Sequence, residues 1–404
     1  MPKLLQINIV SNTLSTGIIC EDIAKVAIKR GWECTIAYGR IAQPGVASEI
    51  KVGTRFDTYE HYFENRLFDN EGLASRFATR RLIRKINEIQ PDIIHLHNIH
   101  DHYLNYKLLF NYLNSTTIQV VWTFHDFWAI TGHCHHFIDA KCEKWKTQCD
   151  KCPLQHSTVN SFIDRSKRNF ELKKRLFTAN KNLTIVPVSY WVGEMVKHSF
   201  LNEKRIEVIP NGINIELFEK SEQSLCQMIP SDKFVILGVA RDWEPGDRKG
   251  FDDYLKLSRL LKDDEIIVLV GIKPSQKGLL PSNVVGLERT KNQEELIGIY
   301  RSANVLLSLS GAETFGLTIV EANACGIPAV VYNNTAPPLL ITEETGYVAK
   351  NGSIKDVYNK IECVKNNGRD YYKNNCIKHV KMHYDKNVNY QKYIDLYEDL
   401  LSLK

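Results

Sequence analysis

Residues 311–328 read GAETFGLTIVEANACGIP, a pattern that indicates a loop followed by a short helix. An apolar strand is expected at 304–309, just before the loop, and the helix is expected to begin near Gly316. Glu313 then lies in the loop and Glu321 within the helix. Backbone N–H groups at a helix N-terminus bind anions, so this arrangement suits a diphosphate held between two carboxylates. The alternative interpretation is a capped amphipathic helix that carries two surface glutamates.

The same strand, loop and helix pattern recurs along the chain. Apolar runs that predict strands lie at 4–10, 34–38, 92–97, 119–124 and 183–188, and then at 234–239, 265–270, 304–309 and 328–332. Strands that alternate with helices in this way predict parallel sheets with crossover helices. Because the pattern starts again near residue 232, we expect an α/β protein with two similar domains that meet at a cleft.

These patterns divide the chain into three parts. We expect a first domain at 1–214, with a cysteine-rich insertion at 133–156, and a second domain at 215–385. The polar stretch 214–233 is the predicted linker. The helical pattern of the tail predicts a C-terminal helix at 386–404 that packs back on the first domain.

The composition excludes several classes of protein. Hydrophobic residues make up 43% and charged residues 25% of the 404 positions, which is ordinary for a globular protein and too apolar for a disordered one. No apolar run approaches the ~20 residues of a membrane-spanning helix, and the start lacks signal-peptide features, so we expect a cytoplasmic protein. The net charge of +5 does not imply a nucleic-acid partner. The sequence has neither G-x-G-x-x-G nor a Walker A motif, which disfavours a dehydrogenase and a P-loop ATPase.

Three segments together resemble a known family. Glu313 and Glu321 match the E-x7-E motif of the retaining glycosyltransferases of family four, which have the GT-B fold. The segments 208–213 and 239–250 resemble, in the same order, that family's domain-closing turn and its Gly-Arg…Lys-Gly segment. The resemblance covers nearly the whole chain. It implies two Rossmann-like domains and transfer of a sugar from a nucleotide-sugar, most simply a UDP-sugar, to a glycan or lipid-linked acceptor in bacterial cell-surface polysaccharide synthesis.

The resemblance also implies roles for individual residues. Arg241 and Lys249 would bind the leaving diphosphate, where positive charge stabilises the developing negative charge, so no catalytic metal is expected. Glu313 would contact the donor sugar and Glu321 the ribose. The implied donor-binding set is Gly17, Arg241, Arg248, Lys249, Glu313, Phe315, Gly316, Leu317 and Glu321. The chain departs from the family at Pro337-Pro338-Leu339, where a Pro-Glu pair is usual near the donor.

The first domain supplies two further candidates. Gly17 closes an expected polar loop at 11–17, where a glycine permits close approach to a phosphate. His125 follows the strand 119–124 and resembles the family's catalytic histidine, with Asp126 expected to set its tautomer. The alternatives are a plain turn at Gly17 and a core histidine at position 125.

Four of the ten cysteines cluster as C-x7-C-x6-C-x2-C, at Cys134, Cys142, Cys149 and Cys152. Thiolates bind zinc tetrahedrally, so the cluster predicts a structural zinc site, with free buried thiols as the alternative. Without a secretory signal, disulfides are not expected.

Two basic segments complete the sequence evidence. Residues 162–177 read as a basic amphipathic helix, and residues 76–85 carry a second basic cluster. Such segments bind anionic membranes, so the chain could lie at the inner face of the cell membrane; the alternative is the solvated face of an ordinary helix. Two other functions stay open: an epimerase or phosphorylase that shares the GT-B architecture, and a non-catalytic, zinc-stabilised binding module.

Overall fold

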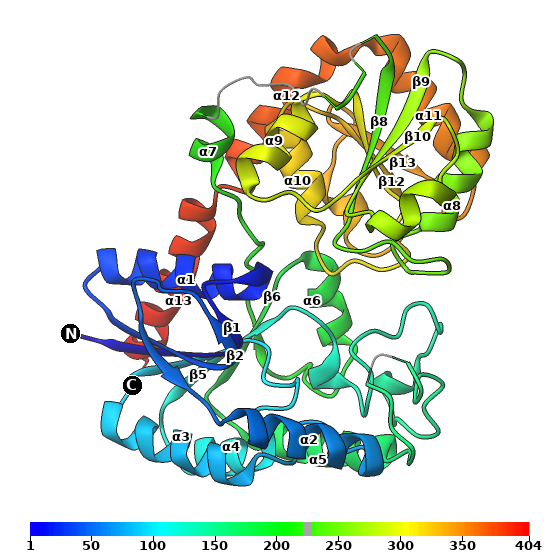
Figure 1. The fold of residues 1–404 in the computed structure, drawn as a ribbon. Helices are drawn as coiled ribbons and strands as arrows, with labels where there is room; N and C mark the ends of the chain where they lie inside the picture. Colours follow the sequence, from blue (N-terminus) through cyan, green and yellow to red (C-terminus); the bar gives the residue numbers. More distant parts are fainter. Residues whose placement is uncertain (158, 221–227, 231, 404) are drawn as a thin grey trace. The chain divides into compact units, whose positions relative to one another are not determined.

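The structure is a computed structural model that describes residues 1–157, 159–220, 228–230 and 232–403. Parts of the predicted linker 214–233, including Cys226, lie outside the described residues. The chain divides into two compact units, Met1–Pro210 with Asn387–Lys404, and Asn211–Lys386. Each contains one parallel sheet covered by helices (Figure 1).

The sheet of the first unit has seven parallel strands in the order β3-β2-β1-β4-β5-β6-β7. Its strands are β1 (Lys3–Ser11), β2 (Glu33–Ala42), β3 (Ser48–Lys51), β4 (Ile93–Leu96), β5 (Gln119–Phe124), β6 (Leu183–Pro187) and β7 (Arg205–Ile206). Its helices are α1 (Leu14–Lys29), α2 (Arg55–Phe68), α3 (Arg76–Ile89), α4 (Tyr106–Leu113), α5 (Ser166–Ala179), α6 (Tyr190–Lys197) and α13 (Lys386–Ser402).

Helix α13 lies beside α1 on one face of this sheet, whereas α3, α4 and α5 lie on the other (Figure 1). The tyrosines Tyr390, Tyr393 and Tyr397 of α13 share one buried apolar cluster with Ile23 of α1. The last helix of the chain therefore completes the core of the first unit.

The sheet of the second unit has six parallel strands in the order β10-β9-β8-β11-β12-β13. Its strands are β8 (Phe234–Val239), β9 (Glu265–Val270), β10 (Val284–Leu287), β11 (Val305–Ser308), β12 (Ala329–Tyr332) and β13 (Gly346–Ala349). Its helices are α7 (Ile215–Lys220), α8 (Phe251–Leu257), α9 (Gln293–Arg301), α10 (Leu317–Ala324), α11 (Ile354–Asn367) and α12 (Arg369–His383).

Strand order reverses once in each sheet, between β1 and β4 and between β8 and β11. In open parallel sheets, ligands bind beyond the carboxyl ends of the strands at such a reversal. The loops that follow these four strands are therefore the places to look for a site.

The predicted α/β class is confirmed, and the nine predicted strands are present with small changes at their ends. The sequence prediction missed β3, β7, β10 and β13, which are edge or near-edge strands of two to four residues. The predicted loop at 11–17 is wrong, because β1 ends at Ser11 and α1 already begins at Leu14.

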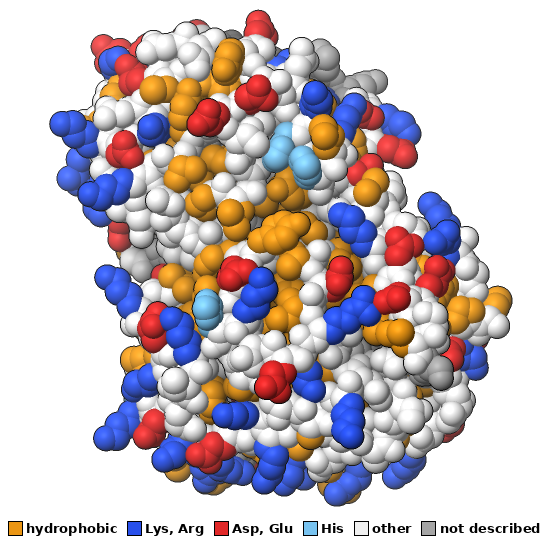
Figure 2. All heavy atoms as spheres, turned by 180° about the vertical axis from the view of Figure 1, so that it is seen from behind, with side chains coloured by type: hydrophobic (Ala, Val, Ile, Leu, Met, Phe, Trp, Pro, Cys, Tyr) orange, Lys and Arg blue, Asp and Glu red, His pale blue; other side chains and the backbone are white. Residues whose placement is uncertain are grey.

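The surface carries mixed charge. Figure 2 shows basic and acidic side chains interspersed over the face that it displays. Among the described residues, no helix is both long enough and apolar enough to cross a lipid bilayer.

Candidate active site

The loops after β8 and β11 are tied together by their backbones. The Arg248 carbonyl accepts hydrogen bonds from Gly311 N at 2.7 Å and from Ser310 Oγ at 2.9 Å. Gly250 has φ +83°, and a Cβ at this position would lie 2.3 Å from the Leu309 carbonyl oxygen. Only glycine allows this approach, so Gly250 fixes the loop after β8 against the end of β11.

This junction brings Lys249 and Glu313 into contact. The Lys249 ammonium forms an ion pair with the Glu313 carboxylate, with 33% and 22% of the two side chains exposed. Both backbones are held as well: Lys249 N donates to Asp247 Oδ1 at 3.0 Å, and Glu313 N donates to Thr335 Oγ1 at 3.1 Å. The pair is therefore ordered from both sides and still open to a ligand.

Helix α10 begins at Leu317, in the segment that follows Glu313. Its N-cap is Gly316, with φ +117°. The preceding Phe315 is buried, with its ring 5.8 Å from that of Tyr384. The first N–H groups of any helix lack intrahelical acceptors, so the N-terminus of α10 offers donors beside the Lys249–Glu313 pair.

Glu321, one of the two predicted carboxylates, is half-buried on α10. Tyr300 of α9, itself fully buried, donates a hydrogen bond to Glu321 Oε2 at 2.8 Å. Burial raises the pKa of Glu321 to about 7, although the hydrogen bond from Tyr300 favours the ionised form. A carboxylate held in this way is a fixed acceptor for hydroxyl groups.

The two predicted arginines lie on the loop after β8. The side chain of Arg241 is 69% exposed, with Nε 3.7 Å from Asp242 Oδ2. Arg248 is exposed, and the contacts described above come from its backbone carbonyl. The side chains of Arg241 and Arg248 are therefore exposed, whereas the Lys249 ammonium contacts the Glu313 carboxylate.

His125 ends a chain of hydrogen bonds in the first unit. Gln6 Nε2 donates to the Cys20 carbonyl at 2.8 Å, so Gln6 Oε1 accepts from His97 Nε2 at 3.0 Å. His97 Nδ1 is then unprotonated and accepts from His125 Nε2 at 3.1 Å. His125 is left with Nδ1 as an acceptor, and burial lowers its pKa to about 4.

The predicted partnership of His125 with Asp126 is wrong. Asp126 Oδ2 instead accepts from His100 Nε2 at 2.8 Å, and Asp126 Oδ1 accepts from Trp128 N at 2.9 Å. His97 takes the expected place of Asp126, because it lies on the neighbouring strand end. Gly17 is also not in a loop: it is buried within the first turn of α1.

The four clustered cysteines line one pocket. Cys134 and Cys149 are buried, whereas Cys142 and Cys152 are half-buried, and none of the four forms a disulfide. A hydrogen bond between Cys134 and Cys152 lowers the pKa of Cys152 to about 7. The chain thus brings the four cysteines to one pocket, and a zinc ion bound there stays a prediction.

The apolar face of α5 is not available to a membrane. Phe170, Leu176 and Phe177 are buried in the first unit, so the amphipathic pattern of this helix reflects core packing. Lys173, predicted to lie on the basic face, is also buried: its ammonium donates to the Trp128 carbonyl at 2.7 Å and to the Thr131 carbonyl at 3.1 Å.

Three residues of these sites had little or no sequence signal of their own. Gln6, His97 and Tyr300 act through partners that are distant in sequence, which only the strand order brings close. For His97, its place at the end of a predicted strand was the available hint.

Two family models match the chain. One, described as "Glycosyl transferases group 1", matches residues 222–381, and the other, described as "Glycosyltransferase Family 4", matches residues 17–217. WcaC of Escherichia coli strain K12, a glycosyl transferase assigned to colanic acid biosynthesis, is 24% identical over 363 residues, which cover 85% of this chain and 86% of WcaC.

Solved structures share the fold over the whole chain. Sucrose-phosphate synthase of Thermosynechococcus elongatus has a TM-score of 0.74 at 15% identity, with 100% of both chains covered. HepE of Anabaena, solved in complex with UDP, has a TM-score of 0.66 at 15% identity, with 99% of this chain and 100% of HepE covered. These neighbours confirm the predicted GT-B fold.

Proposed function

Since the chain belongs to the group 1 glycosyl transferases, we propose that it is a retaining enzyme that moves a sugar from a UDP-sugar to a glycan or lipid-linked acceptor in bacterial cell-surface polysaccharide synthesis. The similarity to WcaC supports the polysaccharide setting. The UDP bound to HepE, which has the same fold, supports the donor.

The observation that carries this proposal is the Lys249–Glu313 pair at the N-terminus of α10. This pair lies where strand order reverses, and it sets a cation, a carboxylate and helix N–H groups side by side. A diphosphate takes the N–H groups and the Lys249 ammonium, because both favour negative charge. Glu313, released from part of its ion pair, then accepts a hydrogen bond from a hydroxyl of the donor sugar.

The other residues of this unit complete the donor site. Glu321 accepts from the ribose hydroxyls, since Tyr300 holds its carboxylate in place. Arg241, whose exposed side chain is free to turn toward a ligand, shares the diphosphate with Lys249. Arg248 could add charge at the same loop. In this scheme the protein's own cations stabilise the leaving diphosphate.

The proposed transfer step is the same-face mechanism that the resemblance to the retaining family implies. The bond between the anomeric carbon and the diphosphate oxygen breaks, and the departing oxygen takes the proton of the acceptor hydroxyl. The acceptor oxygen then bonds to the anomeric carbon on the same face, so the configuration is retained. His125, with Nδ1 free to accept, would bind a hydroxyl of the transferred sugar and so orient it.

Thermal stabilisation by a panel of nucleotide-sugars tests the donor, because a ligand that binds only the folded protein raises its melting temperature. We expect a UDP-sugar to give the largest shift, and the shift to shrink in Lys249→Ala. NMR of the product would then show the retained anomeric configuration. Conversion of free UDP-sugar without any acceptor would indicate an epimerase instead, and absence of stabilisation by every UDP-sugar would overturn the donor assignment.

One surface of the first unit favours a lipid-linked acceptor. On α2, Phe56, Tyr59 and Phe63 recur at the spacing of one helix face and are 76%, 64% and 60% exposed. On α3, Phe77 is 72% exposed and lies under the Arg80 guanidinium. Exposed aromatic rings beside arginines suit the interface of an anionic membrane.

A further inference from the structure

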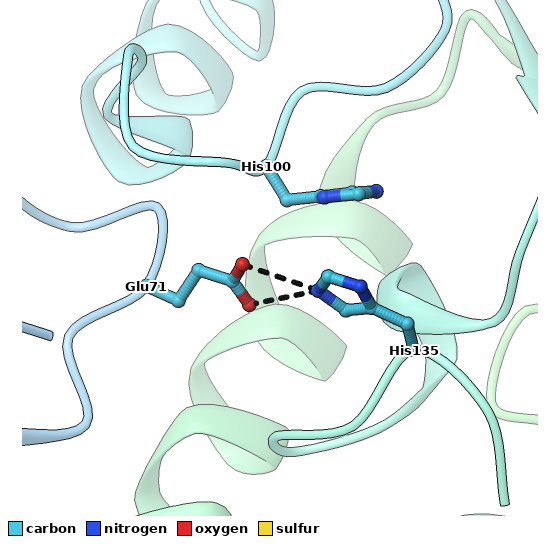
Figure 3. Close-up of side chains that lie close together, drawn as sticks. All are labelled: Glu71, His100 and His135. Atoms are coloured by element: carbon cyan, nitrogen blue, oxygen red, sulfur yellow. Dashed lines mark hydrogen bonds and ion pairs between the residues drawn. The ribbon is translucent and has the colours of Figure 1, made fainter. Parts of the chain in front are cut away.

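Three metal-ligating side chains meet inside the first unit, outside the donor site. Glu71 follows α2, His100 follows β4, and His135 follows β5 (Figure 3). One donor atom from each lies within 4.8 Å of the others. Glu71 and His100 are only 6% and 5% exposed, so this is an interior cluster rather than a surface acidic patch.

The hydrogen bonds of His100 leave one ring nitrogen without a partner. His100 Nε2 donates to Asp126 Oδ2 at 2.8 Å, and Trp128 N fixes the other oxygen of Asp126 at 2.9 Å. His100 Nδ1 is buried and has no hydrogen-bond partner among the described residues. The nearby carboxylate of Asp101 is 3.8 Å away, too far for a hydrogen bond.

The cluster already holds paired charges. Glu71 and Asp126 place two carboxylates in the interior, where Glu71 pairs with His135 and Asp126 accepts from His100. What lacks a partner among the described residues is His100 Nδ1, and a cation bound there would supply one.

The remaining geometry fits coordination. His135 Nε2 lies 3.1 Å and 3.2 Å from the two oxygens of Glu71, and the rings of His100 and His135 are 4.3 Å apart between centroids. Ligands at ~2.1 Å from one tetrahedral zinc ion lie about 3.4 Å apart, close to the separation of His135 and Glu71. A carboxylate that holds the far nitrogen of a ligating histidine, as Asp126 holds His100, is the common support of such sites.

We propose that Glu71, His100 Nδ1 and His135 Nε2 bind a divalent transition-metal ion of the zinc class, with a fourth position left for water. Two imidazoles and one carboxylate are a ligand set that zinc accepts. The ion joins the segments after α2, β4 and β5, and Asp126, the support of His100, is the neighbour of His125. Its role is to fix the strand ends that present His125. This site is separate from the cysteine pocket, although His135 follows Cys134 in sequence.

Metal content tests the proposal independently of sugar transfer. The protein is purified without added metal in a Cys149→Ser/Cys152→Ser background, which removes thiolate-bound zinc. We expect about one metal ion per chain in this background. Glu71→Gln and His100→Gln should each lower the content at least fivefold, whereas the matched control His136→Gln, the residue next to His135, should not change it.

X-ray absorption at the zinc edge identifies the ligands. In the same background we expect nitrogen and oxygen at ~2.0–2.2 Å and no sulfur at ~2.3 Å. If the cysteine variants fail to fold, wild-type protein loaded with zinc must show nitrogen and oxygen ligands in addition to sulfur. Three outcomes would each overturn the proposal. The cysteine-variant background could bind no metal even after dialysis against zinc, or both ligand variants could retain their metal. In the fallback experiment, zinc in the wild-type protein could be bound by sulfur alone.

Discussion

The imidazoles of His125 and His97 lie edge to edge, with the two ring planes 17° apart and His125 Nε2 3.1 Å from His97 Nδ1. This contact, continued through Gln6, decides which nitrogen of His125 carries a proton. It also explains why His125 needs no carboxylate partner, because a neutral ring accepts the hydrogen bond. His125 is therefore an oriented hydrogen-bonding group rather than a cation.

Removing Gln6, which lies at the other end of this chain of hydrogen bonds from His125, should impair transfer without affecting nucleotide binding. Gln6→Met keeps the volume but removes the acceptor for His97, so we expect kcat to fall about tenfold, while UDP affinity, a property of the second unit, stays unchanged. Burial lowers the pKa of His125 to about 4, so this histidine should stay neutral down to about pH 5. Wild-type activity should therefore not fall through protonation of His125 above that pH. In Gln6→Met the acid limb of the pH profile should move, and Gln43→Met, at an exposed glutamine, should behave as wild type. An unmoved pH profile would show a purely structural role for Gln6.

The Lys249–Glu313 pair should matter for turnover and little for stability. We expect Lys249→Ala and Glu313→Ala each to lower transfer by about 100-fold or more, with unchanged circular dichroism. The pair is partly exposed, so its loss should cost no more than ~1 kcal/mol of unfolding free energy. Lys273→Ala, which breaks the exposed pair of Lys273 with Glu244, is the matched control. Near-wild-type turnover of both variants with every plausible donor would remove the site assignment.

Glu321 should make the stability of the second unit depend on pH. Burial raises the pKa of its carboxyl from 4.5 to about 7, so the folded protein loses stability as pH rises from about 4.5 to about 7. The loss is on the order of 3 kcal/mol at most, since one pKa unit corresponds to ~1.4 kcal/mol. Glu321→Gln should remove this component, and the exposed Glu294→Gln should keep it. Urea unfolding at pH 5 and pH 8 measures the pH dependence of stability in wild type and in the two variants. Equal pH dependence in wild type and Glu321→Gln would contradict the assignment of this component to Glu321.

Lys173 should be a structural residue. Its ammonium donates to two backbone carbonyls and lies 3.5 Å from the centre of the Trp128 ring. Lys173→Met leaves both carbonyls without this donor, so we expect a loss of about 2–4 kcal/mol in unfolding free energy. The neighbouring Lys174 is exposed, and Lys174→Met should change stability by less than ~0.5 kcal/mol. Similar melting temperatures for the two variants would argue against this role.

Membrane binding should depend on α2 and α3 rather than on α5. In flotation with vesicles that contain anionic lipid at low salt, Phe63→Ser/Phe77→Ser should reduce the bound fraction several-fold. Tyr371→Ser is the comparison, because Tyr371 is also exposed, at 54%, but lies on α12 of the second unit. Failure of the wild-type protein to float would count against any membrane-bound state.

Sequence patterns located the buried strands well, because such strands of a parallel sheet are continuous apolar runs. The strands β10 and β13 are only four residues long and each contains a glycine, so their pairing depends on neighbours rather than on their own pattern. The apolar face of α5 had the same pattern as a membrane-binding helix, since core packing and lipid binding both select one apolar stripe.

The contacts of the sites were harder to predict than the strands. Lys249 and Glu313 are 64 positions apart, and His97 and His125 are 28 apart. Motifs indicated the first pair as members of one site, but not that their side chains form an ion pair. Asp126 was expected to serve His125 because it is adjacent in sequence; successive residues at a strand end point in different directions, and Asp126 reaches His100 instead.

The position of α13 has a consequence for biosynthesis. The second unit is one continuous segment, and it can fold while the chain is still being made. The first unit, although it is translated first, lacks Tyr390, Tyr393 and Tyr397 until the whole of the second unit has been translated. Until then, the apolar side of α1 lies open to chaperones and to other nascent chains, so emergence of α13 from the ribosome sets the time at which the core of the first unit can close.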